Sequence, residues 1–269
     1  MNTITRLLAA LASLLLMAPH MAAPGSADLA HTNLIAHRGY AAQYTENTLD
    51  AFEDAFDKGF AGVELDVYEG QDQTIFVHHD NTLLRLTGKN LYTWELTMDN
   101  RDQYLLNGKE PVPSLEEVLK LVSVHPGYLY IHMKDDVDNG YVIEERMVAR
   151  IETLLKDYGM LSRTIVFAGK RNILRFAGRY DLHFGIITGK DTMDTLSPLA
   201  DWCGENHVEE VLFLDMTCLE DHAEEKVGLF RDKGVQCSVY TVTNAEELKK
   251  LDDLGCKSAL SDYKLELKD

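Results

Sequence analysis

Short apolar segments alternate with helical segments along the chain from residue 33 onward. Eight of the apolar segments have the length and residue types of strands, and residues 63–68 show a two-residue alternation of apolar side chains. The predicted strands are residues 34–36, 63–68, 128–133, 164–167, 183–187, 210–214, 237–241 and 258–260. A predicted helix follows each strand except the last: residues 48–58, a segment that begins near 114, and residues 141–157, 172–180, 197–203, 223–233 and 245–254.

This order of elements strongly limits the fold. Strands that alternate with helices form parallel sheets, and eight such units fit a closed (β/α)8 or TIM barrel with an active site at the C-terminal face. An open, doubly wound sheet is the main alternative. A strand-like stretch at 74–77 and a polar loop within 70–110 interrupt the pattern. No linker rich in Pro or Gly divides the chain, so residues 33–269 are predicted to form one domain.

The N-terminus has the pattern of an export signal. Arg6 is the only charge before an apolar run at residues 7–17, and Met21, Ala22 and Ala23 lie near a plausible cleavage site. The run is shorter than the roughly 20 residues that cross a bilayer. We therefore expect residues 1–23 to be a signal peptide and the mature protein to be periplasmic or extracellular. The alternative is a hydrophobic helix that packs on the fold.

The net charge of −18 argues against nucleic acid or an anionic membrane surface as the main partner. A small anionic substrate is still compatible with this charge, because a metal ion and a few basic residues can dominate the field inside a cleft. We expect no stable membrane insertion, and the sequence leaves the oligomeric state open. The spacing of the four cysteines matches no zinc motif, and we expect buried free thiols: Cys203, Cys218, Cys237 and Cys256.

Charged and imidazole side chains gather where predicted strands end. In a parallel barrel these ends meet at one face, so residues far apart in the sequence share one site. His37 and Arg38 follow the first strand, and Asp262 follows the last. The other members of this group are Glu64, Asp66, His79, Asp80, His132 and Lys134.

Glu64 and Asp66 are two residues apart on one strand, so both side chains point into the barrel mouth. Two carboxylates placed together need a counter-charge, and a divalent cation with oxygen ligands can supply it. The alternative is that one of them forms a buried ion pair with Arg38 or Lys134.

His37 and His79 are candidates for general acid–base catalysis, since imidazole titrates near neutral pH. Each histidine alone could equally be structural, but two at neighbouring strand ends beside a carboxylate pair favour catalysis. His78 lies on the opposite face of its strand and is expected to be structural. Arg38 offers a planar fork for phosphate oxygens, and Lys134 offers a point charge.

These residues, in this order, resemble the glycerophosphodiester phosphodiesterase family. The similarity spans roughly residues 33–263, and its most specific part is 37–80. The matching motifs are His37-Arg38-Gly39, Glu46-Asn47-Thr48, Glu64-x-Asp66, His79-Asp80, Pro113-x-Leu115-Glu116-Glu117 and a strand ending in Lys134, with weaker similarity at Tyr240-Thr241-Val242 and Ser261-Asp262-Tyr263.

The resemblance implies a role for each matching residue. His37 and His79 would be the general base and general acid, and Glu64 and Asp66 would hold one divalent metal ion, Mg²⁺ or Ca²⁺. Arg38 and Lys134 would bind the phosphate of a small phosphodiester substrate, with Glu46 supporting the site. The products would be a glycerol phosphate and an alcohol.

Two positions depart from the family pattern. His132 stands where a glutamate commonly provides a third metal ligand, so Mn²⁺ or Zn²⁺ becomes an alternative to Mg²⁺ or Ca²⁺. Tyr240, assigned to substrate binding, stands where a tryptophan is usual. Two other functions stay open: a lysophospholipase D-like enzyme, for which the sequence shows no strong apolar rim, and a catalytically silent protein that binds a phosphorylated ligand.

Overall fold

The computed structural model describes residues 31–267. The predicted signal peptide at residues 1–23 lies outside this part of the chain. Within residues 31–267, no helix combines the length and the apolar character needed to cross a membrane.

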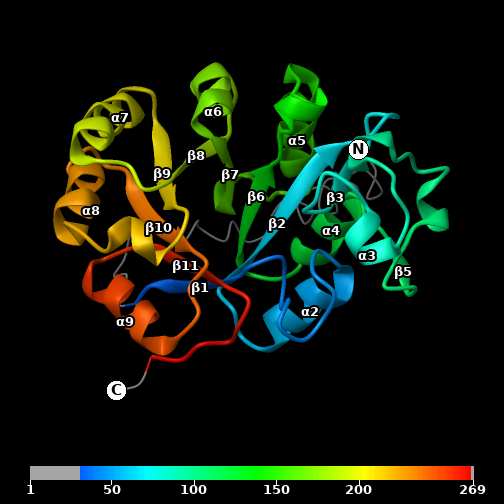
Figure 1. Cartoon of the computed structure of the whole chain (residues 1–269), viewed down its shortest axis with the longest axis horizontal. Helices are drawn as coiled ribbons and strands as arrows, with labels where there is room; N and C mark the ends of the chain where they lie inside the picture. The colour runs from blue at the N-terminus through cyan, green and yellow to red at the C-terminus, as the bar shows by residue number, and fades with distance from the viewer. Residues whose placement is uncertain (1–30, 268–269) are drawn as a thin grey trace, which may run out of the picture.

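Eight parallel strands form a closed barrel, which confirms the predicted (β/α)8 fold (Figure 1). β1 pairs with β11 on one side and with β2 on the other, so the sheet has no break at the first strand and the open-sheet alternative is wrong. The strands are β1 (Asn33–Ala36), β2 (Gly62–Glu69), β6 (Tyr128–Met133), β7 (Thr164–Gly169), β8 (His183–Thr188), β9 (Val208–Phe213), β10 (Gln236–Tyr240) and β11 (Ser258–Ser261).

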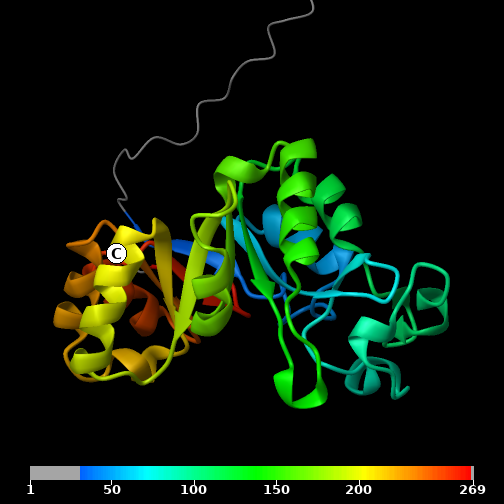
Figure 2. The same ribbon diagram turned by 90° about the horizontal axis from the view of Figure 1, so that it is seen from above.

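Helices surround this barrel, as Figures 1 and 2 show. They bury their apolar faces against the outer side of the strands, where most of the core lies. N-cap side chains fix where two of these helices begin. Thr48 accepts a hydrogen bond from the Ala51 backbone N–H, and Ser114 forms the predicted capping box with Glu117. The helices are α2 (Leu49–Asp57), α4 (Leu115–Val122), α5 (Glu145–Asp157), α6 (Lys170–Phe176), α7 (Met193–Glu205), α8 (Ala223–Arg231) and α9 (Ala245–Asp253).

Three helices differ from their predicted bounds by more than two residues at one end. The helix predicted at 141–157 begins only at Glu145, because Tyr141 is extended and pairs with Asp136. The helix predicted at 172–180 is Lys170–Phe176, and Gly178 follows it with a φ of 74°. The helix predicted at 197–203 is longer, Met193–Glu205. Pro198, which lies near the start of the predicted helix, is inside the observed one.

An insertion lies between β2 and α4, in the segment predicted to contain a strand-like stretch at 74–77 and a polar loop. It contains β3 (Ile75–Val77), which pairs antiparallel with β2, then the short helix α3 (Leu84–Thr87), two 3-10 turns and the small hairpin of β4 (Leu105–Leu106) and β5 (Glu110–Pro111). Figure 1 shows the insertion at one side of the barrel, next to β2 and β3. Its side chains form a separate small core: Phe76, Leu83, Leu96, Leu106 and Val112.

A polar network closes the opposite, N-terminal end of the barrel. The carboxylate of Glu210 is fully buried and accepts hydrogen bonds from Tyr130 Oη at 3.0 Å, from Ser238 Oγ and from Lys257 Nζ at 2.8 Å. All four cysteines are free and buried, as the sequence analysis expects.

Replacing Lys257 by methionine is expected to lower the free energy of unfolding by about 3–5 kcal/mol, because Glu210 would keep a buried charge without its counter-ion. Urea unfolding measures this loss. Lys249→Met is the matched control, since Lys249 makes an exposed pair with Asp253 and its loss should change stability little. Equal effects of the two substitutions would contradict a stabilising role for the Lys257–Glu210 pair.

Candidate active site and metal centre

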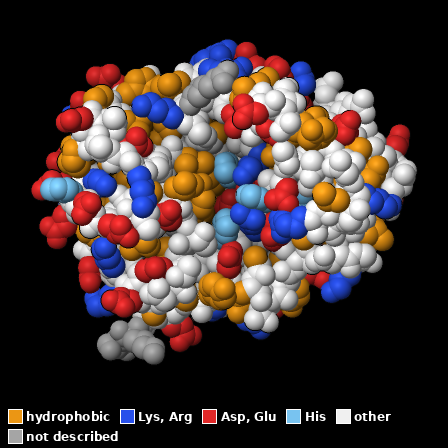
Figure 3. All heavy atoms as spheres, in the orientation of Figure 1, with side chains coloured by type: hydrophobic (Ala, Val, Ile, Leu, Met, Phe, Trp, Pro, Cys, Tyr) orange, Lys and Arg blue, Asp and Glu red, His pale blue; other side chains and the backbone are white. Residues whose placement is uncertain are grey.

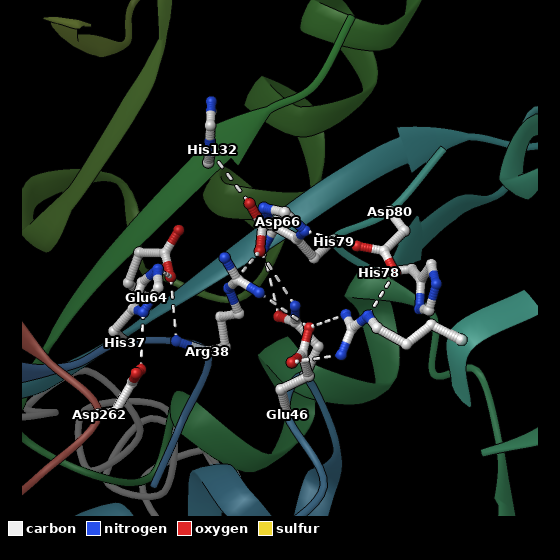
Figure 4. Close-up of polar contacts among 12 residues, drawn as sticks. His37, Arg38, Glu46, Glu64, Asp66, His78, His79, Asp80, His132 and Asp262 are labelled. Atoms are coloured by element: carbon white, nitrogen blue, oxygen red, sulfur yellow. Dashed lines mark hydrogen bonds and ion pairs between the residues drawn. The ribbon is translucent and has the colours of Figure 1, made fainter. Parts of the chain in front are cut away.

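The polar side chains predicted from the strand ends come together at the C-terminal face of the barrel. Figure 3 shows histidines around a hollow near the centre of this face, with hydrophobic side chains on one side and charged side chains on the other. Figure 4 shows that the cluster comes from segments distant in sequence, including the ends of β1, β2 and β6. Hydrogen bonds and ion pairs directly join seven of its members: His37, Arg38, Glu46, Glu64, Asp66, His132 and Lys134. The eighth, His79, is connected to Glu46 through Asp80 and Arg85.

Glu64, Asp66 and His132 form a group that could hold a metal ion. One potential ligand atom from each residue lies within 4.8 Å of those of the other two. Both carboxylates are about 1% exposed, so the pair is removed from water. Burial, together with the charge of Asp66, raises the pKa of Glu64 to about 7. A cation between the two carboxylates would offset their burial and mutual repulsion. The donor set therefore fits a divalent metal.

Asp66 also forms the ion pairs that were the alternative to a metal site. Its carboxylate lies 3.4 Å from Lys134 Nζ and 3.5 Å from Arg38 Nε. Burial would raise the pKa of Asp66, but His132 and Lys134 outweigh it and hold that pKa well below the usual range. Within residues 31–267, the basic side chain that pairs with the Glu64 carboxylate is His37, whose Nε2 lies 3.9 Å away. Asp66 is thus already neutralised by protein, whereas Glu64 is the carboxylate that lacks a strong counter-charge.

His37 is held by a carboxylate from the far end of the chain. Its Nδ1 lies 2.8 Å from Asp262 Oδ1, which leaves Nε2 facing Glu64. Burial lowers the pKa of His37, but Asp262 and Glu64 outweigh it and raise the pKa above its ordinary value. An Asp–His pair of this kind fixes the ring orientation and presents one nitrogen for proton transfer.

The backbone after β1 is shaped to aim the Arg38 amide at the metal group. Arg38 has a φ of 57°, and its N–H donates to Glu64 Oε2 at 3.0 Å. Gly39 follows with a φ of 76°, and a Cβ there would come within 2.8 Å of Ala51. Only glycine avoids that clash, which explains the third residue of the His37-Arg38-Gly39 motif.

His79 is held in the same way as His37. Its Nδ1 lies 2.8 Å from Oδ1 of the neighbouring Asp80. Burial is the main cause that lowers the pKa of His79. His78 is fully buried, with Nε2 3.3 Å from the Thr82 carbonyl, which agrees with the structural role expected for it. Figure 4 shows His37 and His79 on either side of Asp66.

The Arg38 side chain lies mostly buried between the carboxylates of Glu46 and Asp66. Its Nη1 donates to Glu46 Oε1 at 2.9 Å, whereas its buried Nε has no hydrogen-bond partner in the described structure. This nitrogen lies 3.5 Å from Asp66 Oδ2, so it is ion-paired but makes no hydrogen bond, and an anionic oxygen could accept from its N–H. Glu46 thus holds the Arg38 side chain, which is compatible with the supporting role that the resemblance implies for it.

His132 is a neutral ligand candidate. Burial, followed by the charge of Lys134, lowers the pKa of His132 to about 4, so the ring carries no charge near pH 7. Nδ1 lies 3.1 Å from Asp66 Oδ1, and the ring stacks on Phe167 with centroids 4.7 Å apart. The stack and the hydrogen bond together fix the ring.

One side of the mouth is apolar. The inward positions near the ends of β7, β8 and β9 are Phe167, Ile187 and Leu214, which is 46% exposed. Tyr240 completes this side, with its ring centroid 6.1 Å from that of His37. The sequence shows no continuous apolar stretch for this rim, because its residues come from four separate strands or their ends.

Several contacts were not assigned from the sequence. Asn47 Nδ2 donates to Asp66 Oδ2 at 3.0 Å, and Asn47 adopts a φ of 58°. Arg85, from the insertion, binds both Glu46 and Asp80. Asn47 lies inside a matching motif and could have been found from it. Arg85 carries no such signal in a single sequence.

Comparison with known proteins agrees with this geometry. The model of the glycerophosphoryl diester phosphodiesterase family matches residues 37–265. A glycerophosphodiester phosphodiesterase of Bacillus altitudinis is 37% identical over 129 residues, which cover 45% of this chain and 53% of that protein. The match therefore spans about half the length of that relative.

Solved structures share the fold. A glycerophosphodiester phosphodiesterase from Thermotoga maritima superposes with a TM-score of 0.70 at 24% identity, covering 86% of this chain and 95% of that one. An Oleispira antarctica phosphodiesterase in complex with the product sn-glycerol-3-phosphate gives a TM-score of 0.73 at 18% identity, covering 87% and 94%. Because the family match takes in the whole site from His37 to Asp262, the chain belongs to the glycerophosphoryl diester phosphodiesterase family.

Proposed function

We propose that the protein hydrolyses small glycerophosphodiesters to a glycerol phosphate and an alcohol, with one divalent metal ion. The observation that carries this proposal is the pair of histidines, each with Nδ1 2.8 Å from an aspartate and Nε2 left for reaction. The name of the Bacillus altitudinis relative and the product bound to the Oleispira antarctica structure support the substrate class.

Each residue of the cluster has a task in this reaction. Arg38 and Lys134 hold the phosphate oxygens, and the apolar side with Tyr240 accommodates the rest of the substrate. One histidine removes the proton from the attacking oxygen, which belongs to water or to the neighbouring glycerol hydroxyl; attack by the hydroxyl first gives a cyclic phosphate, which water then opens to glycerol phosphate. The other histidine donates a proton to the leaving alkoxide as the phosphorus–oxygen bond breaks.

Glu64, Asp66 and His132 would hold the metal ion. When bound, it would supply positive charge to the phosphate oxygens as negative charge develops there. The carboxylates suit Mg²⁺, Ca²⁺ or Mn²⁺, and the imidazole favours Zn²⁺ or Mn²⁺.

The test is release of glycerol 3-phosphate from glycerophosphocholine and glycerophosphoethanolamine. The protein is stripped of metal, and Mg²⁺, Ca²⁺, Mn²⁺ and Zn²⁺ are added back separately. We expect no release without metal and restored release with at least one ion. A folded protein that stays inactive with every ion, yet binds glycerol 3-phosphate, would instead be a silent binding protein.

The apolar side of the mouth favours a second candidate, a lysophospholipase D-like enzyme. The partly exposed Ile187, which packs on the cluster that contains the buried Phe167, and the half-exposed Leu214 offer a surface for an acyl chain next to the phosphate site. Lysophosphatidylcholine is therefore included as a substrate beside glycerophosphocholine. A higher kcat/KM for the lysophospholipid, lost in Leu214→Asp, would favour this candidate over the first.

We also propose that the protein acts outside the cytoplasm, on the strength of the signal-like pattern in residues 1–23. Fractionation of cells that express the full chain tests it. Retention in the cytoplasm with the N-terminus uncleaved would contradict it.

A further inference from the structure

Arg85 lies on α3 of the insertion, outside the barrel itself. Leu83, two residues before Arg85, is fully buried in the small core of the insertion with Phe76 and Leu96. Gly88 ends α3 in the left-handed conformation, and its N–H bonds to the Leu84 carbonyl. The insertion thus has its own packing and turn chemistry to hold Arg85 in place.

The guanidinium of Arg85 contacts two carboxylates with different nitrogens. Nη1 and Nη2 donate to the two oxygens of Glu46, at 2.9 and 2.6 Å. Nε donates to Asp80 Oδ2 at 2.6 Å. This is a bidentate contact on one side and a single contact on the other, which uses the planar fork of arginine fully.

Each of these carboxylates has a second partner in the active site. Glu46 also accepts from Arg38 Nη1, and Asp80 also contacts His79 Nδ1 (Figure 4). The result is a continuous network of basic and acidic side chains in alternation. At one end is the proposed phosphate-binding arginine, and at the other end is the proposed acid–base histidine. The network runs Arg38, Glu46, Arg85, Asp80, His79.

The electrostatics agree with a tightly coupled network. Burial raises the pKa of Asp80, but hydrogen bonds from Arg85 and His79 outweigh it and lower that pKa to about 2. Burial also raises the pKa of Glu46, but Arg85 and Arg38 outweigh it, so the pKa of Glu46 lies below its ordinary value. A single exposed ion pair contributes little, but a bidentate, networked arginine is the exception to that rule.

We propose that Arg85 is a positioning residue that couples the insertion to the active site, setting the orientation of Arg38 through Glu46 and of His79 through Asp80. This inference rests on the proposed phosphodiesterase function. It gives Arg85 a part in the reaction, although Arg85 itself brings no group to the reacting atoms; the reacting group that the insertion supplies is His79, which follows β3.

The first test compares Arg85→Lys and Arg85→Gln with Lys89→Gln. Lys89 is the matched control, because it lies in the same insertion and donates to the Gln103 carbonyl, away from the site. We expect kcat/KM for glycerophosphodiesters to fall about 10–100-fold in both Arg85 variants, the size typical of a misplaced catalytic geometry. Lysine should not rescue, since one ammonium cannot contact Glu46 and Asp80 with the same geometry.

A double-mutant cycle separates positioning from a general structural effect. No hydrogen bond joins Glu46 and Asp80 in the described structure, but both contact Arg85. Glu46→Gln and Asp80→Asn should therefore be non-additive in kcat/KM with Arg85 present and additive in the Arg85→Gln background. Unchanged kcat/KM in Arg85→Gln, full rescue by lysine, or additivity in both backgrounds would overturn the inference.

Affinity for inorganic phosphate, measured by calorimetry, tests the same inference without turnover. Arg85→Gln should weaken phosphate binding several-fold through Arg38, whereas Lys89→Gln should leave it unchanged. If the wild-type protein binds phosphate but hydrolyses no diester, the proposed function fails while this result still decides the role of Arg85. If hydrolysis occurs and phosphate affinity is equal in wild type and Arg85→Gln, coupling to Arg38 fails instead.

Discussion

His37→Ala and His79→Ala are each expected to lower kcat for a glycerophosphodiester by about 10²–10⁴-fold, the usual contribution of a general acid or base. Both rings are fixed through Nδ1 by an aspartate, so truncation removes an oriented proton carrier and leaves phosphate binding by Arg38 largely in place. Steady-state kinetics with saturating metal measure the effect, and kcat should fall far more than KM rises.

A substrate with a good leaving group separates the two roles. A p-nitrophenyl phosphodiester needs no proton on its leaving oxygen, so the variant that lacks the general acid should recover most of its lost rate. The variant that lacks the general base should not recover. His222→Ala is the control, because this exposed histidine pairs with Glu225 outside the cluster and should keep full activity. Recovery in both variants, or in neither, would contradict an acid–base pair.

Much of this site could be predicted because its residues sit at strand ends. In a barrel, position along a strand and side-chain alternation together decide which residues reach the mouth, and both can be read from the sequence. Glu64 and Asp66 show this: their spacing on one strand places both in the group with His132. The roles of His37, His79 and Tyr240 remain predictions until kinetics test them.

Which side chains of this face contact one another, and what the insertion adds to them, could not be predicted in this way. Asp262 meets His37 across 225 positions, and Arg85 meets Glu46 across 39, because barrel closure and insertion packing bring them together. The apolar side of the mouth has the same origin, since each of its residues comes from a different strand. The helix predicted from residue 141 starts only at Glu145, because Tyr141 forms a bridge with Asp136. This contact overrides the helix propensity of the segment.

His132→Glu is expected to change which metal ion the protein prefers. Glutamate replaces a neutral imidazole by a third carboxylate beside Glu64 and Asp66. Oxygen ligands suit Mg²⁺ and Ca²⁺, whereas imidazole suits Zn²⁺, so affinity for Mg²⁺ should rise and affinity for Zn²⁺ should fall. We expect each to change on the order of 10–100-fold, the range found for changes near a metal ion.

Calorimetry with each metal ion measures this shift directly and does not depend on turnover. Thermal unfolding provides a second readout: without metal, three buried carboxylates repel one another, so the midpoint of His132→Glu should lie below that of the wild type. Saturating Mg²⁺ should then raise the midpoint of the variant more than that of the wild type, because the stabilisation by a ligand grows with the logarithm of its affinity for the folded state.

His132→Gln is the matched control, because glutamine removes the imidazole without adding charge. It should weaken Zn²⁺ binding and leave Mg²⁺ affinity near the wild-type value. The ring of His132 is fixed by Phe167 and Asp66, so loss of that fixed nitrogen is the main change in this variant. If all three proteins rank the four metal ions in the same order, His132 does not select the metal, and the Glu64–Asp66 pair alone would have to set the preference.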